Sequence, residues 1–437
     1  MPADRRFGFR TRALHAGTSP DSATGARAQP IYLSSAFVFD STEHAAELFS
    51  LRSYGTIYTR LSNPTVAAFE EKLASLEGGL GAVATSSGQA AQMVAVLALA
   101  QAGDHLVASA NLYGGTITQF SVTLRRLGID VSFVPQGDPA AMATAVTSRT
   151  KALYAETIGN PQGVIADIPS LADIAHAAGL PLIVDNTFAS PYLCRPIEHG
   201  ADIVLHSATK FIGGHGTVMA GVLVDSGRFD WSTAHPLVSQ PSPSYHGMNF
   251  RETFGEYAFL MRCRVEVLRD IGCCLSPMDA WLLIQGLETL AVRVEAQTRS
   301  ARCVAEHLRR HEAVAWVRYA GLPEDPDFPQ AQRLLPDGAG SILTFGLRGG
   351  RVGAVAFIEA LELWSHVANV GDVKSLVIHP ASTTHSQLTQ AELEAAGVGD
   401  EMVRLSVGLE DVEDLLWDLD CGLEAATAAS VSAGAPV

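Results

Sequence analysis

This chain of 437 residues has few cysteines, few basic residues relative to acidic ones, and no long apolar run, and each of these shortages argues against a class of protein. Six cysteines are too few for a disulfide framework, and the adjacent Cys273 and Cys274 are expected to be buried, reduced thiols. Lys and Arg number 30 against 46 Asp and Glu, and the resulting net charge of −16 argues against nucleic acid or anionic lipid as the main partner. No apolar run is long enough to span a bilayer or to follow Arg5 and Arg6 as a signal peptide, so a soluble, cytoplasmic protein is expected.

The length suits two or three domains, and a hydrophobic content of 47% is enough for a large core. Residues 1–63 are rich in Gly, Ser, Thr and Pro without a sustained period, which indicates an extended arm. Residues 64–275 alternate between short apolar strands and helices. Residues 276–421 follow another pattern and are predicted to form a smaller α+β domain. The Ala, Ser and Gly of residues 422–437 indicate a flexible tail.

The middle segment carries the clearest periodicity. Asn63-Pro64-Thr65 is predicted to open a helix that ends at Glu77-Gly78. The strands and helices that follow predict an α/β fold, with a mostly parallel sheet covered by helices on both faces. Ligands of such sheets bind at the carboxyl ends of the strands. The expected strands are 82–85, 105–109, 130–134, 152–156, 181–185 and 202–206.

The pattern changes near residue 275. Residues 278–309 are predicted to form one long helix with few breaks. A strand is expected at 341–347, and residues 369–387 are expected to be rich in loops. The segment 276–421 therefore has the mixed composition of a separate, smaller domain.

A lysine, Lys210, follows the end of one predicted strand, in a chain with only four lysines. Partial burial and nearby positive charge would favour the neutral amine that a Schiff base requires. Hydroxyl groups at Ser207 and Thr209 could donate to a phosphate, and the glycines of 213–216 allow close approach of the backbone. Taken alone, such a lysine is more often a surface residue before a flexible loop.

Three further segments lie at predicted strand ends. Asp185 could hold a proton on the ring nitrogen of pyridoxal phosphate (PLP), or could merely cap a turn. Ser87-Gly88-Gln89 stands where a helix begins, which is an anion site or an ordinary cap. Tyr113 could stack on a flat ring and pass protons in catalysis, or serve only in packing. Each signal is weak, but together with Lys210 they predict a PLP enzyme that acts on an amino acid.

The chain also resembles the Cys/Met-metabolism group of PLP-dependent enzymes, which have the aspartate-aminotransferase-like fold type I. The resemblance runs from about Thr11 to Asp420 and is strongest to the O-acetylhomoserine sulfhydrylases. Gly115 departs from the methionine γ-lyases of this group, which carry Cys at that position. The matching segments are AETIGNP at 155–161, PSYHG at 243–247, ETFG at 252–255 and NVGDVKSLVIHPASTTH at 369–385.

The resemblance implies a role for each residue of a cofactor and substrate site. Lys210 would bind the cofactor covalently and later carry protons. Tyr58 and Arg60 would reach the phosphate of the neighbouring subunit, while Arg404 and Ser375 would bind the substrate carboxylate. The remaining cofactor contacts would be Asp185 at the ring nitrogen, Tyr113 on the ring face, Asn160 at the ring hydroxyl, and Ser87, Gly88, Gln89, Ser207 and Thr209 at the phosphate.

The implied reaction converts O-acetyl-L-homoserine and sulfide to L-homocysteine and acetate, a step of methionine biosynthesis, in a homotetramer built from dimers with shared sites. Cystathionine γ-synthase and O-succinylhomoserine sulfhydrylase are the alternatives within the group. A Rossmann-like binding module without chemistry is the alternative of another class, and it would need neither Lys210 nor Asp185.

A metal site is not expected, because His199, His206 and His215 have no companion ligands at suitable spacing.

Overall fold

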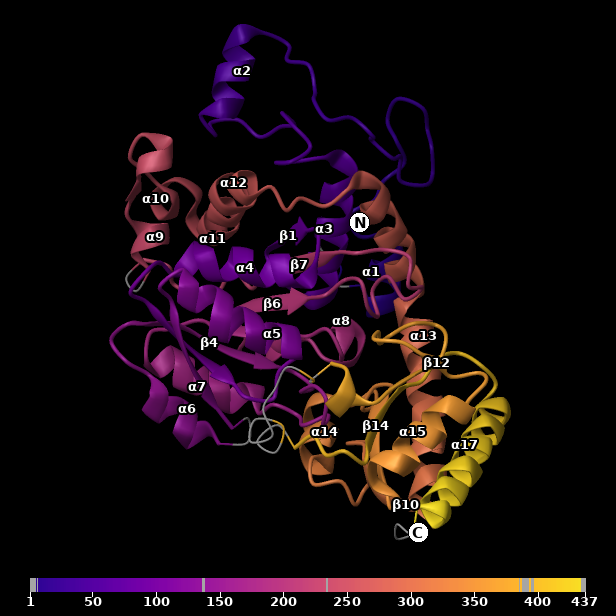
Figure 1. Ribbon diagram of the computed structural model, residues 1–437. Helices are drawn as coiled ribbons and strands as arrows, with labels where there is room; N and C mark the ends of the chain where they lie inside the picture. The colour runs from indigo at the N-terminus through magenta and orange to yellow at the C-terminus, as the bar shows by residue number, and fades with distance from the viewer. Residues whose placement is uncertain are drawn as a thin grey trace.

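Two domains and an N-terminal arm make up the computed structural model (Figure 1), which describes residues 5, 7–135, 138–232, 235–384, 386, 393 and 397–433. The larger domain carries a seven-stranded sheet in the order β1-β7-β6-β5-β4-β2-β3, in which only β7 is antiparallel to its neighbours. The strands are β1 (Gly81–Thr85), β2 (His105–Ser109), β3 (Asp130–Val134), β4 (Thr150–Glu156), β5 (Leu182–Asp185), β6 (Ile203–His206) and β7 (Gly221–Asp225).

All six strands predicted for this domain are present, and the expected α/β architecture is confirmed. The seventh strand, β7, was missed by the sequence analysis. It closes the gap between β1 and β6, so that the strand ends beside Ser87 and Ser207 become neighbours.

Helices cover both faces of this sheet, as a buried parallel sheet requires. Leu182 and Val184 of β5 belong to one buried cluster, which includes α3 (Pro64–Glu77) and α7 (Ile168–Ala177). Ile183 between them belongs to a second cluster, with α4 (Gly88–Leu99). The other α-helices of this domain are α5 (Gly114–Thr118), α6 (Pro139–Ala145), α8 (Ser190–Leu193), α9 (Pro236–Ser239), α10 (Phe250–Phe254), α11 (Ala258–Arg262) and α12 (Arg269–Ile271), with π-helices at Gln119–Leu124 and Cys263–Leu268.

Helix α3 begins and ends as the sequence predicts. The Asn63 side chain accepts a hydrogen bond from the backbone N–H of Thr65, and Pro64 occupies the first turn. The helix ends at Gly78, whose φ of 80° is a left-handed conformation that glycine adopts without strain.

Helix α13 (Pro277–Arg310) connects the two domains and packs against both α3 and β10. The smaller domain has a five-stranded sheet in the order β10-β11-β14-β13-β12, with α15 (Gly350–Ala360) packed against α17 (Val412–Ser432). Its strands are β10 (Val314–Arg318), β11 (Ile342–Leu347), β12 (Ser365–His366), β13 (Leu376–Ile378) and β14 (Met402–Ser406), and it also holds α14 (Phe328–Leu334).

One prediction for the C-terminal half is incomplete and another is wrong. The described part of 369–387 is rich in loops, as predicted, but it also contains the short buried strand β13, while its end at Gln387 lies outside the described residues. The expected tail is helical as far as Ser432, because Leu423 and Ala426 are buried and α17 packs against α15. Alanine-rich composition favours a helix as soon as one face of it can be buried; residues 434–437 lie outside the description.

The arm has two different parts. Helix α1 (Phe9–His15) packs against α3 and α13 of its own chain. Helix α2 (Thr42–Phe49) stands apart from the body at the top of Figure 1, and near it Val38 and Tyr54 are 97% and 93% exposed. None of the described helices has both the length and the apolar character that a membrane span requires.

Candidate active site

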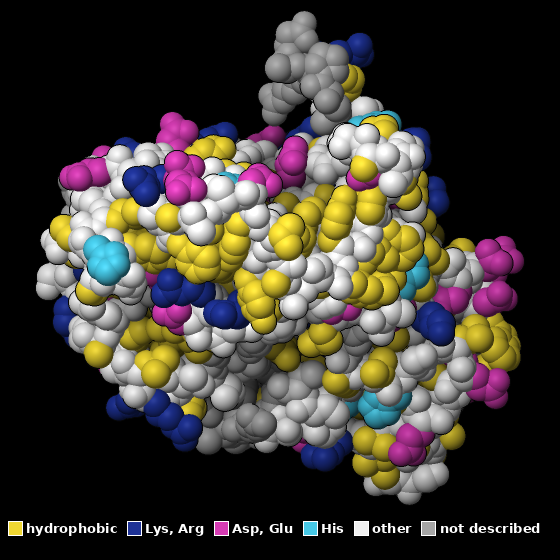
Figure 2. Space-filling view, turned by 90° about the horizontal axis from the view of Figure 1, so that it is seen from above, with side chains coloured by type: hydrophobic (Ala, Val, Ile, Leu, Met, Phe, Trp, Pro, Cys, Tyr) yellow, Lys and Arg dark blue, Asp and Glu magenta, His cyan; other side chains and the backbone are white. Residues whose placement is uncertain are grey.

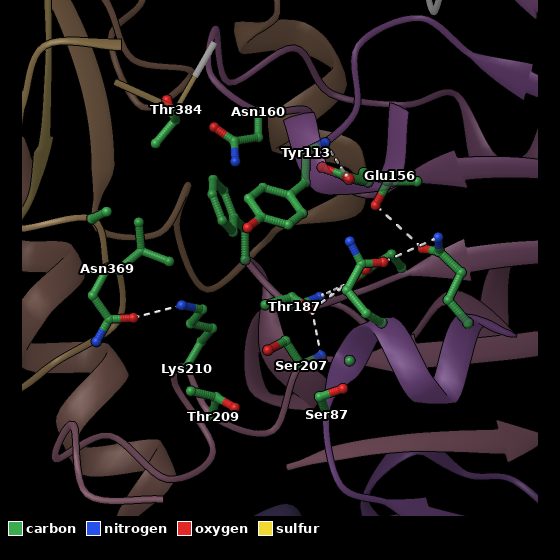
Figure 3. A pocket seen from close by; sticks show the side chains of 18 of the residues that line it. Ser87, Tyr113, Glu156, Asn160, Thr187, Ser207, Thr209, Lys210, Asn369 and Thr384 are labelled. Atoms are coloured by element: carbon green, nitrogen blue, oxygen red, sulfur yellow. Dashed lines mark hydrogen bonds between the residues drawn. The ribbon is translucent and has the colours of Figure 1, made fainter. Parts of the chain in front are cut away.

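A pocket lies at the carboxyl ends of the parallel strands, between the two domains (Figure 3). Strands β4, β5 and β6 each deliver a residue to it at their ends or in the turn that follows. The structure thereby gathers residues that are spread over more than three hundred positions of the sequence. The predicted site residues that line it are Ser87, Gly88, Gln89, Tyr113, Asn160, Asp185, Ser207, Thr209, Lys210 and Arg404.

The first turn of α4 forms one end of the pocket. The Ser87 side chain accepts from the N–H of Ala90 at 3.1 Å, which leaves the N–H groups of Gly88 and Gln89 at the open end of the helix. A Cβ atom on Gly88 would lie 2.8 Å from that of Ser207, so only glycine permits this close approach. These features fit a phosphate group, which helix N-termini bind through free N–H groups and the helix dipole.

Thr209 also lines the pocket, but its hydroxyl has a structural task. It accepts from the backbone N–H of Ala220 at 2.9 Å and faces the carbonyl oxygen of the same residue at 3.2 Å. The Thr209 hydroxyl was expected to bind a phosphate. In the structure it also fixes the backbone of Ala220, the residue that precedes β7.

Asp185 ends β5, and its carboxylate does two things at once. Its Oδ1 atom accepts from the backbone N–H of Thr187 at 2.9 Å and from the Thr187 hydroxyl at 2.5 Å. The Thr187 oxygen accepts in turn from the N–H of Ser207 at 2.8 Å. Burial raises the pKa of Asp185, and the two donors of Thr187 and the nearby His206 oppose that rise. The sequence analysis gave a turn cap and a pocket carboxylate as alternative roles of Asp185, and in the structure Asp185 is in both positions.

Lys210 follows β6 and places its ammonium group in the pocket. Burial, followed by the nearby Arg404, lowers the pKa of this lysine from 10.5 to about 8. Its Nζ atom donates to Oδ1 of Asn369 at 2.6 Å (Figure 3). Among the described residues it is the lysine that lines this pocket, since Lys72 is buried against the carbonyl of Ala13.

The loop after Lys210 is held by residues that the sequence analysis did not identify. The buried guanidinium of Arg293, on α13, donates to the carbonyl oxygens of Phe211 and Ile212 at 2.9 and 3.3 Å. The N–H of Val373 donates to the carbonyl of Gly214 at 2.8 Å. Both contacts join distant segments, so no local pattern could have indicated them.

Arg404 is the second cation of the pocket. It lies on β14, is 4% exposed, and donates from Nη1 to Oδ1 of Asn160 at 2.9 Å. Burial lowers the pKa of its guanidinium to about 10, so it remains protonated near neutral pH. No carboxylate within the described part of the chain forms an ion pair with it, and a buried, unpaired cation is suited to an anionic ligand.

Tyr113 precedes α5 and is 47% exposed. Its backbone N–H donates to Oε1 of Glu156 at 2.7 Å, a carboxyl group that the sequence analysis quoted without a role. Beneath its ring lies Gly115, where an added Cβ would fall 2.4 Å from Cε1 of Tyr113 and 2.5 Å from Nε2 of Gln89. A larger residue at 115 would therefore displace the aromatic ring.

Three predicted site residues do not line the pocket. Ser375 directly precedes β13, and its hydroxyl donates to Glu410 at 2.9 Å instead of lining the pocket. Tyr58 and Arg60 line a separate hollow next to Cys274. There the guanidinium of Arg60 donates to the carbonyl of Arg269, with Cζ 5.5 Å from the centre of the Tyr58 ring.

A lysine with a lowered pKa, a carboxylate at a strand end and an anion cradle define the site of a PLP-dependent enzyme of fold type I. The sequence profile of the family described as Cys/Met metabolism PLP-dependent enzyme matches residues 10–424. The chain belongs to this family, as the sequence predicted. This membership excludes the binding module without chemistry.

Curated relatives agree over nearly the full length of the chain. An "O-acetyl-L-homoserine sulfhydrylase" of Corynebacterium glutamicum is 50% identical over 96% of this chain and 98% of its own. One of the same description from Leptospira meyeri is 47% identical over 96% and 97%. A "homocysteine synthase" of Schizosaccharomyces pombe is 48% identical over 98% and 100%.

Solved structures agree with the fold. A "putative O-acetylhomoserine (thiol)-lyase" of Campylobacter jejuni, with a pyridoxyl-lysine phosphate residue at its position 205, superposes with a TM-score of 0.93 at 37% identity, covering 96% of this chain and all of its own. A cystathionine γ-lyase of Lactobacillus plantarum reaches 0.83 at 34% identity, with the same coverage. The pocket described above thus belongs to a PLP enzyme.

Proposed function

We propose that this enzyme is an O-acetylhomoserine sulfhydrylase, which converts O-acetyl-L-homoserine and sulfide to L-homocysteine and acetate in methionine biosynthesis. The observation that carries the substrate class is the placement of Arg404 and Lys210 in one pocket, which suits an amino acid with a free carboxylate. The reaction type rests on the curated relatives, whose descriptions name this chemistry over the full chain.

The residues of the pocket can also be assigned to individual parts of the cofactor. Asp185 would keep the ring nitrogen protonated, Tyr113 would stack on the ring, and the turn at 87–89 with Ser207 would hold the phosphate. When bound, PLP supplies an electron sink for the negative charge that develops on the substrate carbon next to the amino group. We assign covalent attachment to Lys210, the lysine that lines the pocket.

Protons would be moved by the amine of Lys210. A pKa of about 8 lets a useful fraction of this amine be neutral near pH 7, so that it can take a proton from the substrate and return it. Asn369 holds its Nζ atom at 2.6 Å and so limits the positions it can occupy. Arg404, oriented by Asn160, would bind the substrate carboxylate and direct the reacting bonds toward that amine.

Gly115 supports replacement of the acetyl group over its elimination, because the residue beside Tyr113 has no side chain that could reach the substrate. We propose that acetate leaves and hydrosulfide adds at the same carbon. A cation beyond Lys210 and Arg404 would be needed to recognise a succinyl ester, and the described lining of the pocket contains none.

We further propose a homotetramer of dimers in which Tyr58 and Arg60 serve the pocket of the neighbouring subunit. Both lie outside the pocket of their own chain. Hydrophobic side chains gather on the face that Figure 2 shows from above, the side from which the arm projects. Exposed apolar residues of the arm and the helices near it are Leu33, Val38, Phe49, Tyr54, Tyr257, Ile271 and Met278, and a second subunit would cover such residues.

A substrate panel tests the reaction. Purified enzyme loaded with PLP is offered O-acetyl- or O-succinyl-homoserine, each with sulfide or cysteine, and the products are identified by mass spectrometry. We expect homocysteine to form fastest from the acetyl ester and sulfide, and no product from the Lys210→Ala variant. Faster formation of cystathionine from the succinyl ester and cysteine would establish cystathionine γ-synthase instead.

A further inference from the structure

Glu156 is a second carboxyl group in the wall of the pocket, beside Asp185. It ends β4 as Asp185 ends β5, and the two residues are direct partners in the register of the parallel strands. Glu156 is 5% exposed and lines the same pocket (Figure 3). Two carboxyl groups are therefore held at neighbouring strand ends, in a place with little access to water.

The surroundings of the two carboxyl groups differ. Oδ1 of Asp185 accepts a hydroxyl and an N–H from Thr187, both of which favour the charged form. Glu156 accepts the backbone N–H groups of Tyr113 and Asn160, two residues that line the same pocket. These two N–H groups favour the charged form of Glu156, as the donors of Thr187 favour that of Asp185, but a neutral carboxyl group can also accept them through its carbonyl oxygen. Because His206 is an additional stabilising neighbour of Asp185, the negative charge is better supported on Asp185 and the proton on Glu156.

Burial, followed by the nearby charge of Asp185, raises the pKa of Glu156 well above its usual range. The same direction follows from geometry, because two like charges at adjacent strand ends in a low-dielectric site disfavour each other. The other titratable groups that face the pair are Tyr113 before α5, Tyr154 on β4, His206 on β6, Lys210 after β6 and Arg404 on β14.

We propose that Glu156 is a protonated positioning residue of the cofactor site, which holds Tyr113 and Asn160 while leaving Asp185 as the single negative charge beside the ring nitrogen. This inference rests on the role proposed above for Asp185. A second carboxylate at that place would compete for the ring proton and repel an electron-rich ring. A neutral carboxyl group holds the backbone of Tyr113 and Asn160 without that effect.

Infrared spectroscopy measures the proton directly and needs no turnover. The carbonyl stretch of a protonated carboxylic acid is separate from the bands of a carboxylate, and it shifts when glutamate is labelled with ¹³C. In cofactor-free protein at pH 7 we expect wild type minus Glu156→Gln to show loss of a protonated-acid band. Glu424→Gln, at an exposed position on α17, is the control and should show loss of a carboxylate band. A carboxylate band in the Glu156 difference would overturn the proposal.

Two substitutions separate charge from position. Glu156→Gln keeps a neutral acceptor at the same place and should retain cofactor affinity and kcat within about threefold. Glu156→Ala leaves two buried N–H donors without their acceptor and should weaken cofactor binding, measured by fluorescence quenching, by roughly 10–100-fold. If the glutamine variant loses as much as the alanine variant, the negative charge is used and the proposal is wrong.

The infrared result stays informative if a variant does not fold. Wild-type protein labelled with ¹³C-glutamate must then show a protonated carboxyl signal at neutral pH, and its absence would reject the inference. The proposed role of Asp185 fails separately, when Asp185→Asn leaves the kinetics unchanged. A protonated Glu156 together with an inert Asp185 would keep the present assignment of the proton and remove the proposed function of Asp185.

Discussion

The pocket and the part of the N-terminal arm around Tyr58 and Arg60 differ in how their polar side chains are held. In the pocket, Lys210, Arg404 and Asp185 are each held by a hydrogen bond to another residue of the same chain. In the outer part of the arm, around α2 and Tyr58, Tyr58 is 42% exposed, and Arg60 donates to a backbone carbonyl and lies over that aromatic ring. The fold of one chain preorganises the first set, whereas the function proposed above would have a neighbouring subunit order the second.

This difference separates two kinds of prediction. A residue that the sheet positions can be tested by substitution in one chain, because its partners are known. A residue on an arm without its own core has to be ordered by docking, since burial must compensate the loss of conformational freedom. Its test requires two chains.

The largest effect is expected for Lys210→Ala. This variant should lose turnover entirely, together with the covalent attachment of PLP that borohydride reduction and peptide mapping detect. Lys374→Ala, at an exposed lysine, is the matched control and should keep both. A label found on Lys72, Lys151 or Lys374 would contradict the assignment.

The arm is tested by mixing two inactive variants, Arg60→Ala and Lys210→Ala, under conditions that exchange subunits. If sites are shared across subunits, some mixed dimers hold one site with both defects and one with neither, and activity returns from near zero. If Arg60 serves its own chain, every site keeps a defect. If mass spectrometry proves that subunits have exchanged and no activity returns, Arg60 does not serve the pocket of a neighbouring subunit, and the difference drawn between the pocket and the arm is wrong.

Asp185→Asn should keep the cofactor and lose most of the activity. A neutral amide cannot hold the ring proton, and the loss of a charge-assisted hydrogen bond of about 1.5–3 kcal/mol corresponds to roughly 10–150-fold in rate. Steady-state kinetics at saturating PLP measure this. Unchanged kinetics would leave Asp185 with the turn of Thr187 as its only task.

The smallest effect is expected at Asn369. Removing the hydrogen bond from Lys210 to the uncharged amide of Asn369, in Asn369→Ala, should cost about 0.5–1.5 kcal/mol, roughly 2–13-fold in kcat. Asn369→Asp should raise the pKa of Lys210 above its value of about 8, because a carboxylate stabilises the ammonium form. The rise of kcat with pH should then move to higher pH in Asp and stay in place in Ala. An identical shift in both variants would show that charge is not the cause.

Much of the site could be read from strand ends. Asp185, Tyr113 and the turn at 87–89 were found because each follows an apolar strand and precedes a helix, and parallel strands bring such positions to one edge. The resemblance assigned Ser375 to the substrate site but could not give the direction of its side chain, which the structure turns toward Glu410. The expected tail was wrong because its packing against α15 is not a property of the segment itself.

The sequence by itself determined the class of this protein: the order of the strands and helices apart from β7, the lysine after β6, and the family to which it belongs. Local periodicity and chain order are sufficient for the strands and the lysine, while the family follows from the resemblance of the matching segments. Only the tertiary structure decided that Asn369 and Arg293 hold the lysine and its loop, that Glu156 stands beside Asp185, and that Tyr58 lies outside its own pocket. Each of these depends on contacts between distant segments, and such contacts exist only once the sheets and α13 have packed together.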